Sequence, residues 1–579
     1  MRSPSVTANA YKTVGRPVCS FVGVRTTVAP RSRDSYSVCV INRYSRSLTC
    51  LASLLSVVLV ATTPSAVAAQ DSAVPTRHSG DRLVEATAAQ QWSVVRELLT
   101  QSDAVNVNTR RADEATTLLW ATHWDNLEVM DLLIEAGADV DAADDHGVTA
   151  LARAAENASL AAVQRLLAAG AAATAAQTSG LTPLMTASRT GNPDVVRALI
   201  QAGAQVNAAT RETGSTALMW AIAEPHPAIV HILLEEGADA SASTPRGFTA
   251  LMFAARNGDI ETAQALLDAG ADVNDTGHDG THALPFSIVS GQQAFALFLL
   301  KHGADPNGTM GGVPALHTAV GDVRLWLDDW IRRHGRLDRR RLDGDGRLPV
   351  VKALLAAGAD PNGRISESMM VMSYIGYPKK GAFEPFGCGT GDLRGATPLW
   401  VAAFDMNGAF AHRFTAVGMR SASSTEILET LLAAGADPHL VTADGSTPLM
   451  AAAGLGRATY TPREPRGIPA PSAEAAVMTL VTAGADINAV NEADFTALHG
   501  AAMRGLNEVI GYLVNEGADI DARDFRGRTS YRLAQGSKQS FQFQSWPETA
   551  DFLAELGANT ALGIPGTVQE RLRDIPAAP

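Results

Sequence analysis

The apolar and polar positions of this chain follow a pattern that returns about every 33 residues. An apolar segment such as 250–255 precedes a polar turn, a second apolar segment such as 260–268, and a Gly-Ala pair. The glycine of this pair recurs at steps of 33, 33, 34, 33 and 33 residues, at Gly137, Gly170, Gly203, Gly237, Gly270 and Gly303. It returns less regularly at Gly358, Gly435, Gly484, Gly517 and Gly557. A segment that recurs in this way is a structural unit rather than a unique active-site loop.

Each unit predicts two short helices joined by a tight turn. Thr249 suits the N-cap of the first helix, because its hydroxyl can accept a backbone N–H. In other units a proline follows this threonine, at the position where a helix tolerates proline best. The second helix ends at Gly270, which fits the left-handed position just past a helix end. Asp, Asn and Gly between units are typical of turns.

The recurring motifs resemble those of the ankyrin repeat family. They read LTPLMTAS (181–188), VPALHTAV (313–320), STPLMAAA (446–453) and FTALHGAA (495–502). The resemblance implies an all-α solenoid of about 12 helix-turn-helix repeats with short β-hairpin-like turns and long central insertions. It also implies that His317 and His499, at the signature histidine position, support neighbouring repeats by hydrogen bonds.

This repeat pattern divides the chain into six predicted parts. They are a basic leader with a signal-like segment (1–69), a linker (70–80), regular repeats 1–7 (81–311), repeats 8–10 with insertions (312–493), repeats 11–12 (494–562) and a C-terminal tail (563–579). The first and last repeats are degenerate, as capping repeats are expected to be.

Long insertions interrupt the pattern in its middle. Repeats 8, 9 and 10 carry extra residues between their two helices, so these inserts are expected to cluster on one ridge of the stack. The segment 363–395 instead leaves from a turn between repeats. In the first insert, the arginines among 332–341 are expected to pair with nearby aspartates on a solvated helical arm. Gripping a carboxylate-rich or phosphate partner is the alternative.

The leader indicates export. Residues 48–61 form an apolar run that follows Arg43 and Arg46 and precedes a stretch of small residues. This order is typical of a secretory signal, with cleavage after Ala68 or Ala69. The stretch before the run is long for such a signal, which favours a start assigned too early over an organelle transit segment. The body is expected to be periplasmic or secreted; an uncleaved segment that anchors it to a membrane is the alternative.

Composition narrows the classes of partner. The chain has 579 residues, of which 46% are hydrophobic and 18% charged, with a net charge of −13. Residues 1–69 hold eight basic residues and one acid, so the remainder is strongly acidic and nucleic acid is not an expected partner. The chain has four cysteines, of which only Cys388 lies after the leader, so the body cannot form an internal disulfide.

Candidate catalytic and metal sites are weak throughout. Protease, hydrolase and nucleotide-binding signatures do not occur in the sequence. His278 and His282 lie on an ordinary repeat turn without a convincing third metal ligand, Asp343 begins only a fragment of a calcium loop, and Cys388 lies in a glycine-rich segment without a dinucleotide-binding frame. The chain is therefore expected to be no enzyme and to need no metal, cofactor or small-molecule substrate.

The predicted function is a protein-protein interaction scaffold that binds an unidentified protein through its concave surface and central inserts. The alternatives are an exported effector that acts on host or neighbouring-cell proteins, and an enzyme whose residues lie in the inserts. Trp120, Trp220 and Phe253 share one helix position and are expected to pack between helices. By resemblance, the partner contacts map to exposed aromatic, basic and polar positions. They are His123, Trp124, Arg189, Arg246, Phe248, Arg256, Asn257, Phe495, Met503 and Arg504, with Met369, Met370, Tyr374, Tyr377, Phe383 and Phe386 of the 363–395 insert.

Overall fold

The structure, a computed structural model, divides into two compact units, Met1–Val74 and Pro75–Pro579. It describes residues 79–101, 105–323, 326–334, 342, 344–366, 394–406, 423–455, 471–524, 527–536 and 545–562, all in the second unit. The predicted leader, Cys388, the tail 563–579 and most of the 363–395 insert lie outside these residues.

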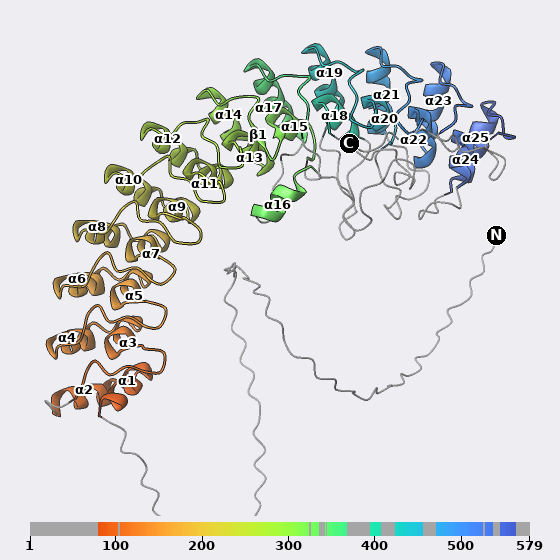
Figure 1. Cartoon of the computed structure of the whole chain (residues 1–579). Helices are drawn as coiled ribbons and strands as arrows, with labels where there is room; N and C mark the ends of the chain where they lie inside the picture. The colour runs from red at the N-terminus through yellow and green to blue at the C-terminus, as the bar shows by residue number, and fades with distance from the viewer. Residues whose placement is uncertain are drawn as a thin grey trace, which may run out of the picture. The chain divides into compact units, whose positions relative to one another are not determined.

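The second unit is a stack of helices in two parallel rows (Figure 1). Each helix of the first row contacts the next helix of that row and the second-row helix that follows it in the sequence. The first row consists of α1 (Ser79–Ala88), α3 (Thr117–His123), α5 (Ala150–Glu156), α7 (Pro183–Thr190), α9 (Ala217–Ala223), α11 (Ala250–Asn257), α13 (Ala283–Val289), α15 (Ala315–Val320), α18 (Pro398–Met406), α20 (Pro448–Ala452), α22 (Ala497–Arg504) and α24 (Ser530–Gln535).

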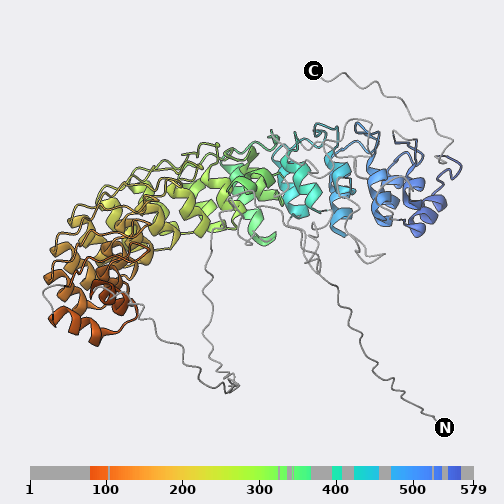
Figure 2. The ribbon, with the colours of Figure 1, turned by 60° about the horizontal axis from the view of Figure 1, so that its bottom comes forward.

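The second row runs alongside the first, and Figure 2 shows the stack of both rows from another direction. It consists of α2 (Trp92–Gln101), α4 (Leu127–Glu135), α6 (Leu160–Ala168), α8 (Pro193–Gln201), α10 (Pro227–Glu235), α12 (Ile260–Asp268), α14 (Gln293–Lys301), α17 (Gly344–Ala356), α19 (Thr425–Ala433), α21 (Pro471–Thr482), α23 (Asn507–Asn515) and α25 (Pro547–Glu555). One helix, α16 (Asp328–His334), belongs to neither row. The buried leucines, valines and alanines of both rows form one continuous core.

We call the turns that precede the first-row helices finger turns, and those before α3, α5, α9, α11, α13 and α15 are short hairpins. One of them forms a two-stranded sheet, β1 (Thr309–Met310) with β2 (Val313–Pro314). Its two loop glycines have φ of +56° and +76°, the sign at both positions that a type I′ turn requires. The corresponding turns in earlier repeats close with single bridges such as Ala143 to Thr149. We call the side of the stack formed by the finger turns and first-row helices the finger face.

The predicted helix ends are confirmed where they were assigned. The Thr249 hydroxyl accepts the backbone N–H of Met252 at 3.3 Å, and the same cap begins most first-row helices. Gly270 follows α12 with φ of +95°, and the Ala271 N–H bonds back to the Leu266 carbonyl at 3.0 Å. This arrangement is a Schellman ending, which a glycine adopts without steric cost.

An asparagine on the finger-turn side of one repeat clamps the following repeat. Asn207 donates its side-chain amide to the Gly237 carbonyl at 2.9 Å and accepts the Asp239 N–H at 2.8 Å. Both bonds are made to backbone groups at the end of the next second-row helix. The same pair of bonds is made by Asn108, Asn274, Asn307, Asn362 and Asn488.

The clamp persists where the spacing of the repeats changes. Asn307 reaches Gly358, 51 residues further along the chain, and Asn362 reaches Gly435, 73 residues further. The regular clamps span only 29 or 30 residues. Neighbouring repeats therefore join through the same pair of bonds, whatever the number of residues between the asparagine and the glycine.

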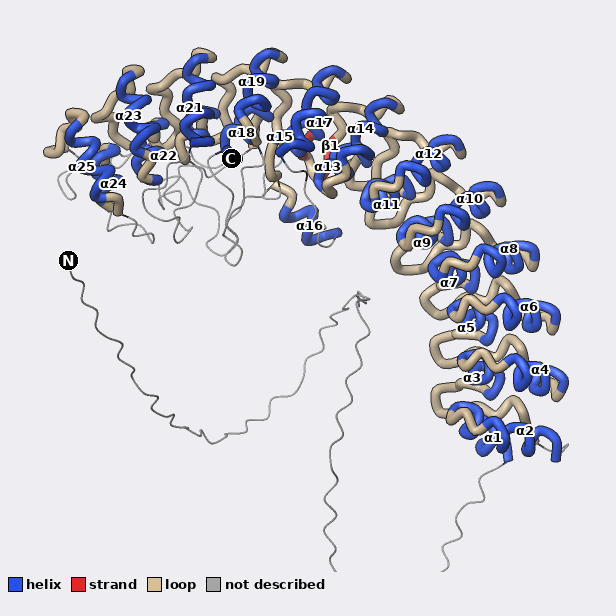
Figure 3. The backbone as a smooth tube through the Cα atoms, turned by 180° about the vertical axis from the view of Figure 1, so that it is seen from behind, coloured by secondary structure: helices blue, strands red, loops and turns tan. Residues whose placement is uncertain are grey.

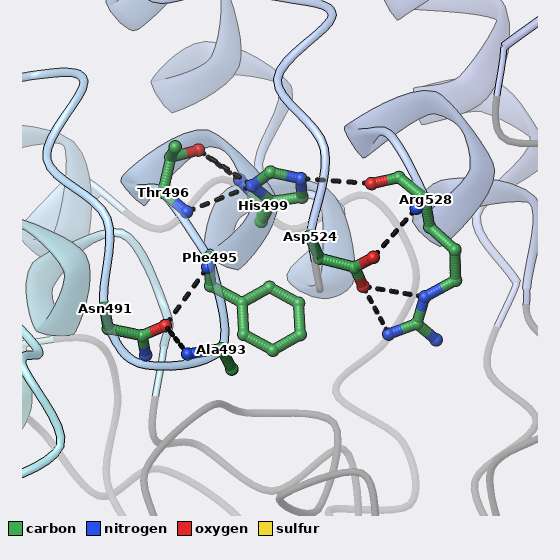
Figure 4. Close-up of polar contacts among 7 residues, drawn as sticks. All are labelled: Asn491, Ala493, Phe495, Thr496, His499, Asp524 and Arg528. Carbon is green, nitrogen blue, oxygen red and sulfur yellow. Dashed lines mark hydrogen bonds and ion pairs between the residues drawn. The ribbon is translucent and has the colours of Figure 1, made fainter. Parts of the chain in front are cut away.

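Two buried histidines join first-row helices to the following finger turns. His317 is fully buried, and its Nε2 bonds to the Ala396 carbonyl at 3.0 Å. His499 is also fully buried; its Nδ1 lies 3.0 Å from the Thr496 N–H, and its Nε2 lies 3.4 Å from the Arg528 carbonyl (Figure 4). Both make the hydrogen bonds to neighbouring repeats that the resemblance implied. Burial is the main cause that lowers the pKa of His317 to about 4, and it also lowers the pKa of His499.

Within the part of the chain that the structure describes, no helix is both long enough and apolar enough to cross a membrane.

We expect Asn207→Ala to lower the free energy of unfolding by about 1–2 kcal/mol, because it removes two hydrogen bonds between adjacent repeats. The urea midpoint at constant cooperativity measures this change. Asn515→Ala is the control, since Asn515 is an exposed residue at the end of α23. Equal midpoints for the two variants would contradict a stabilising role for the clamp.

We expect the chain to lose stability as the pH falls from about 6.5 to about 4, in part through His317. The unfolded chain binds a proton in this window and the folded chain does not, so acid favours unfolding. This lowering of the pKa corresponds to roughly 3 kcal/mol of the free energy of unfolding. The contribution is fully present above about pH 6.5 and is lost as the pH falls to about 4. Urea midpoints across this window should fall less steeply for His317→Gln than for the wild type. His146→Gln, at an exposed histidine, is the control substitution, and equal slopes for His317→Gln and the wild type would contradict the assignment.

Candidate protein-interaction surface

The finger face carries an aromatic cluster at its N-terminal end. Trp120 lies on α3 and Trp124 follows that helix, so their spacing of four residues places them on one side of it. Their rings stack with centroids 6.4 Å apart, and the His123 ring meets Trp124 edge-on at 4.6 Å. The Arg111 guanidinium lies 5.4 Å from the Trp120 ring, within range of a cation–π interaction. Trp124 remains 39% exposed.

Charged side chains border this cluster on the next two first-row helices. Arg153 pairs with Glu156 at 2.6 Å on α5, and Arg189 of α7 lies 4.0 Å from the same carboxylate. Burial, and then the positive charge of Arg153, lower the pKa of His123. The structure thus places His123 and Trp124 on one side of α5 and Arg189 on its other side, so that an exposed aromatic group is bordered by charges of both signs.

The predicted contacts Arg246 and Phe248 lie further along the same face, where both contact another segment of the chain. Phe248 is only partly exposed and contacts Trp330 and His334 of α16, with ring centroids 5.9 and 5.5 Å away. The Arg246 side chain is exposed, but its carbonyl lies 2.8 Å from the His334 Nε2. These two residues contact an insert of their own chain.

Arg256 and Asn257 end α11, and they differ in role. The Arg256 side chain is exposed, whereas Asn257 is half-buried and donates its amide to the Ile222 carbonyl at 2.8 Å. Asn157 and Asn192 make similar bonds to the preceding repeat. Asn257 therefore contributes to the contact between repeats.

The exposure expected of Phe495 and Met503 is wrong. Phe495 is fully buried and Met503 is 9% exposed. The Asn491 carboxamide oxygen accepts the N–H groups of Ala493 and Phe495, which folds the finger turn so that the Phe495 ring points into the stack beside His499 (Figure 4). Arg504 is half-buried. Tyr374, Tyr377, Phe383 and Phe386 lie outside the described residues.

Part of the first insert, residues 326–334, docks on the finger face, and we call it the insert segment. Figure 1 and the reverse view in Figure 3 both place α16 on the finger side of α13 and α15. Trp326, Leu327 and Trp330 are at most 3% exposed. The prediction that this insert forms a solvated arm is therefore wrong for one side of the segment, which is buried against the stack. On its other side the expected pairing occurs, since Arg332 and Arg333 contact Asp329 at 3.4 and 3.2 Å.

The two tryptophans attach the insert segment to different parts of the stack. The Trp330 indole donates to the Thr281 hydroxyl at 2.9 Å and contacts the Phe286 ring at 5.8 Å. Trp326 meets Trp400 and Phe404 of α18 edge-on, with centroids 6.2 Å away in each case. Truncating a buried tryptophan generally costs about 3–5 kcal/mol, so these contacts hold the segment firmly. The spacing of four residues between Trp326 and Trp330 could have predicted an apolar side of this helix. The many charged residues around the two tryptophans favoured a solvated helix instead.

The other candidate chemical groups take part in the scaffold. His282 Nδ1 lies 3.1 Å from the Thr309 N–H and joins two finger turns, while His278 is exposed. Trp220 and Phe253 are partly buried and pack on the core, as expected for their shared position. Among the described residues, no group of three or more histidine, cysteine or acidic side chains is placed to hold a metal ion.

Two rows of paired helices joined by finger turns define a helical repeat protein. Comparison with known families identifies its repeats: residues 83–177, 151–244 and 236–310 match the model described as ankyrin repeats (3 copies), and residues 494–525 match the ankyrin repeat model. The chain therefore contains ankyrin repeats, which generally act as non-enzymatic protein-interaction modules.

Two similar proteins cover only parts of the chain. Alpha-latroinsectotoxin-Lt1a of Latrodectus tredecimguttatus is 32% identical over 132 residues, which is 23% of this chain and 7% of the toxin. The crystal structure of the human ASB11 ankyrin repeat domain is 28% identical, with a TM-score of 0.34. The match covers 37% of this chain and 96% of that domain.

Proposed function

We propose that this protein is a scaffold that binds another protein through the finger face at α3, α5 and α7. The exposed ring of Trp124 carries the proposal. A stacked tryptophan pair offers a large and rigid apolar contact, the kind of group that dominates binding energy at protein interfaces. Arg153, Glu156 and Arg189 beside it supply a polar rim that orients a partner.

The fixed geometry of the stack supports this role. Clamps, caps and buried histidines position the finger-face side chains before any partner arrives, so binding requires little ordering of the protein. The partner segment is expected to present an apolar or aromatic side chain to Trp124 and charged groups to Glu156 and Arg189. Strong negative charge over the body argues against a nucleic-acid partner.

Export is the second part of the proposal. The apolar run at 48–61, with arginines before it and small residues after it, supports a secretory signal and hence a periplasmic or secreted body. A retained segment would anchor the same body to a membrane.

We expect Trp124→Ala to reduce recovery of a specific protein partner at least tenfold in quantitative affinity capture from the native envelope or secreted fraction. Ile260→Ala is the matched control, because Ile260 is 36% exposed but lies in the second row on α12. Equal urea midpoints for Trp124→Ala and the wild type would show that the substitution does not act by destabilising the fold. A partner set that is unchanged by Trp124→Ala would contradict binding through this surface.

We expect the mature protein to begin near Ala69 or Gln70 when it is expressed in its native cells. Intact mass and N-terminal sequencing of protein from separated cell fractions measure this directly. A full-length cytoplasmic chain would contradict export, and a full-length chain in the membrane fraction would support the anchor instead.

A further inference from the structure

The insert segment lies on the finger face in the way that a bound helix lies on a receptor. Trp326, Trp330 and His334 follow one another at steps of four residues, so they share one side of the segment. This side faces the stack, and the Trp330 and His334 rings stack with centroids 4.3 Å apart. Arg332 and Arg333 of the same helix are exposed.

The surface beneath the segment is formed by other repeats. Phe248, Thr281 and Phe286 precede Trp330 by 82, 49 and 44 residues. Helix α13 contacts both α11 and α15 directly, and the Asn307 clamp joins this region to the next repeat without using the segment. The helices beneath the segment therefore pack on one another without its help, and the segment lies on top of a surface that they form by themselves.

Each part of this surface recognises a chemical feature of the segment. The Phe248 and Phe286 rings form an aromatic slot for Trp330, and the Thr281 hydroxyl accepts its indole N–H. One helical turn later, the Arg246 carbonyl accepts from His334 at 2.8 Å, and the Asp279 carboxylate lies 3.3 Å from the same ring nitrogen. The surface thus selects a helix with an indole followed, four residues later, by a polar N–H donor.

We propose that this surface is a helix-binding site, and that the insert segment is its built-in occupant, which an amphipathic helix of a partner protein displaces. The partner helix carries an aromatic side chain, preferably tryptophan, and a histidine or basic side chain four residues later. The inference rests on the proposed function as a binding scaffold, but it concerns a different part of the finger face. A tethered segment competes at an effective concentration of up to millimolar, so the site is largely closed in the free protein.

The test uses the full chain and a labelled peptide with the sequence of residues 322–336. In the opened variant, Trp330→Ala with His334→Ala, the built-in occupant loses its contacts with Phe248, Phe286, Thr281 and Arg246, while these surface residues are unchanged. Fluorescence anisotropy should show peptide binding at least tenfold tighter to this variant than to the wild type. The matched control, Arg332→Ala with Arg333→Ala, changes the exposed side of the same helix and should behave like the wild type. A peptide that carries the same two substitutions should not bind the opened variant.

Failure to bind the peptide in a variant that keeps its helical circular dichroism would overturn the proposal, as would equal binding to opened and wild-type chains. A stable dimer between wild-type and opened chains would also contradict it, because a second copy would then be the occupant. None of these results depends on Trp124. The capture experiment at α3 can therefore fail while the peptide experiment confirms the helix-binding site. Equally, the capture experiment can succeed while the peptide experiment fails.

If the opened variant does not fold, hydrogen exchange of the wild-type chain tests whether the insert segment leaves the intact stack. Release of the segment from an intact stack predicts that the amides of 328–334 exchange at least tenfold faster than those of α13 and α15. Equal exchange rates would show that the segment unfolds only together with the repeats, and would overturn the proposal.

Discussion

The contact between adjacent repeats is the constraint on which the rest of this structure depends. A single pair of short helices cannot bury its apolar residues alone, so each repeat is completed by its neighbours. The clamp at Asn207 and the buried His317 add directional hydrogen bonds to this burial, and they connect backbone groups whose positions hardly vary between repeats. Neighbouring repeats therefore join in one register, which gives the finger face its regular spacing of side chains.

The same constraint explains how the chain accommodates its insertions. The clamp uses a finger turn and the glycine after a second-row helix, so residues added between the two helices leave it intact, as Asn307 and Gly358 show. Where the first insert returns to the stack, the buried Arg347 on α17 donates to the carbonyls of Thr318, Ala319 and Gly321. A side chain thus satisfies backbone acceptors at the end of α15 that would otherwise be buried without partners.

Sequence periodicity predicted what every repeat shares, because these features depend on local chemistry. Thr249 as a cap and Gly270 past a helix end are of this kind. The contacts of individual residues depend on three-dimensional neighbours, which no periodicity contains. Phe495 was expected to be exposed, yet a single Asn491 side chain folds its turn inward. The docking of α16 was missed because its dense charges indicate solvent, although Trp330 belongs to an apolar stripe along the same helix.

The finger face consequently presents two aromatic surfaces in different states. At its N-terminal end the ring of Trp124 is exposed to solvent, whereas at α13 the ring of Phe286 is covered by Trp330. Both surfaces are built on the same rigid rows, so the difference lies in the insert and not in the scaffold. An insertion between the two helices of a repeat can therefore cover one part of the finger face while the ring of Trp124 at its N-terminal end stays exposed. In a repeat protein, an insert can therefore change which surface residues are accessible without changing the contacts between repeats that the fold requires.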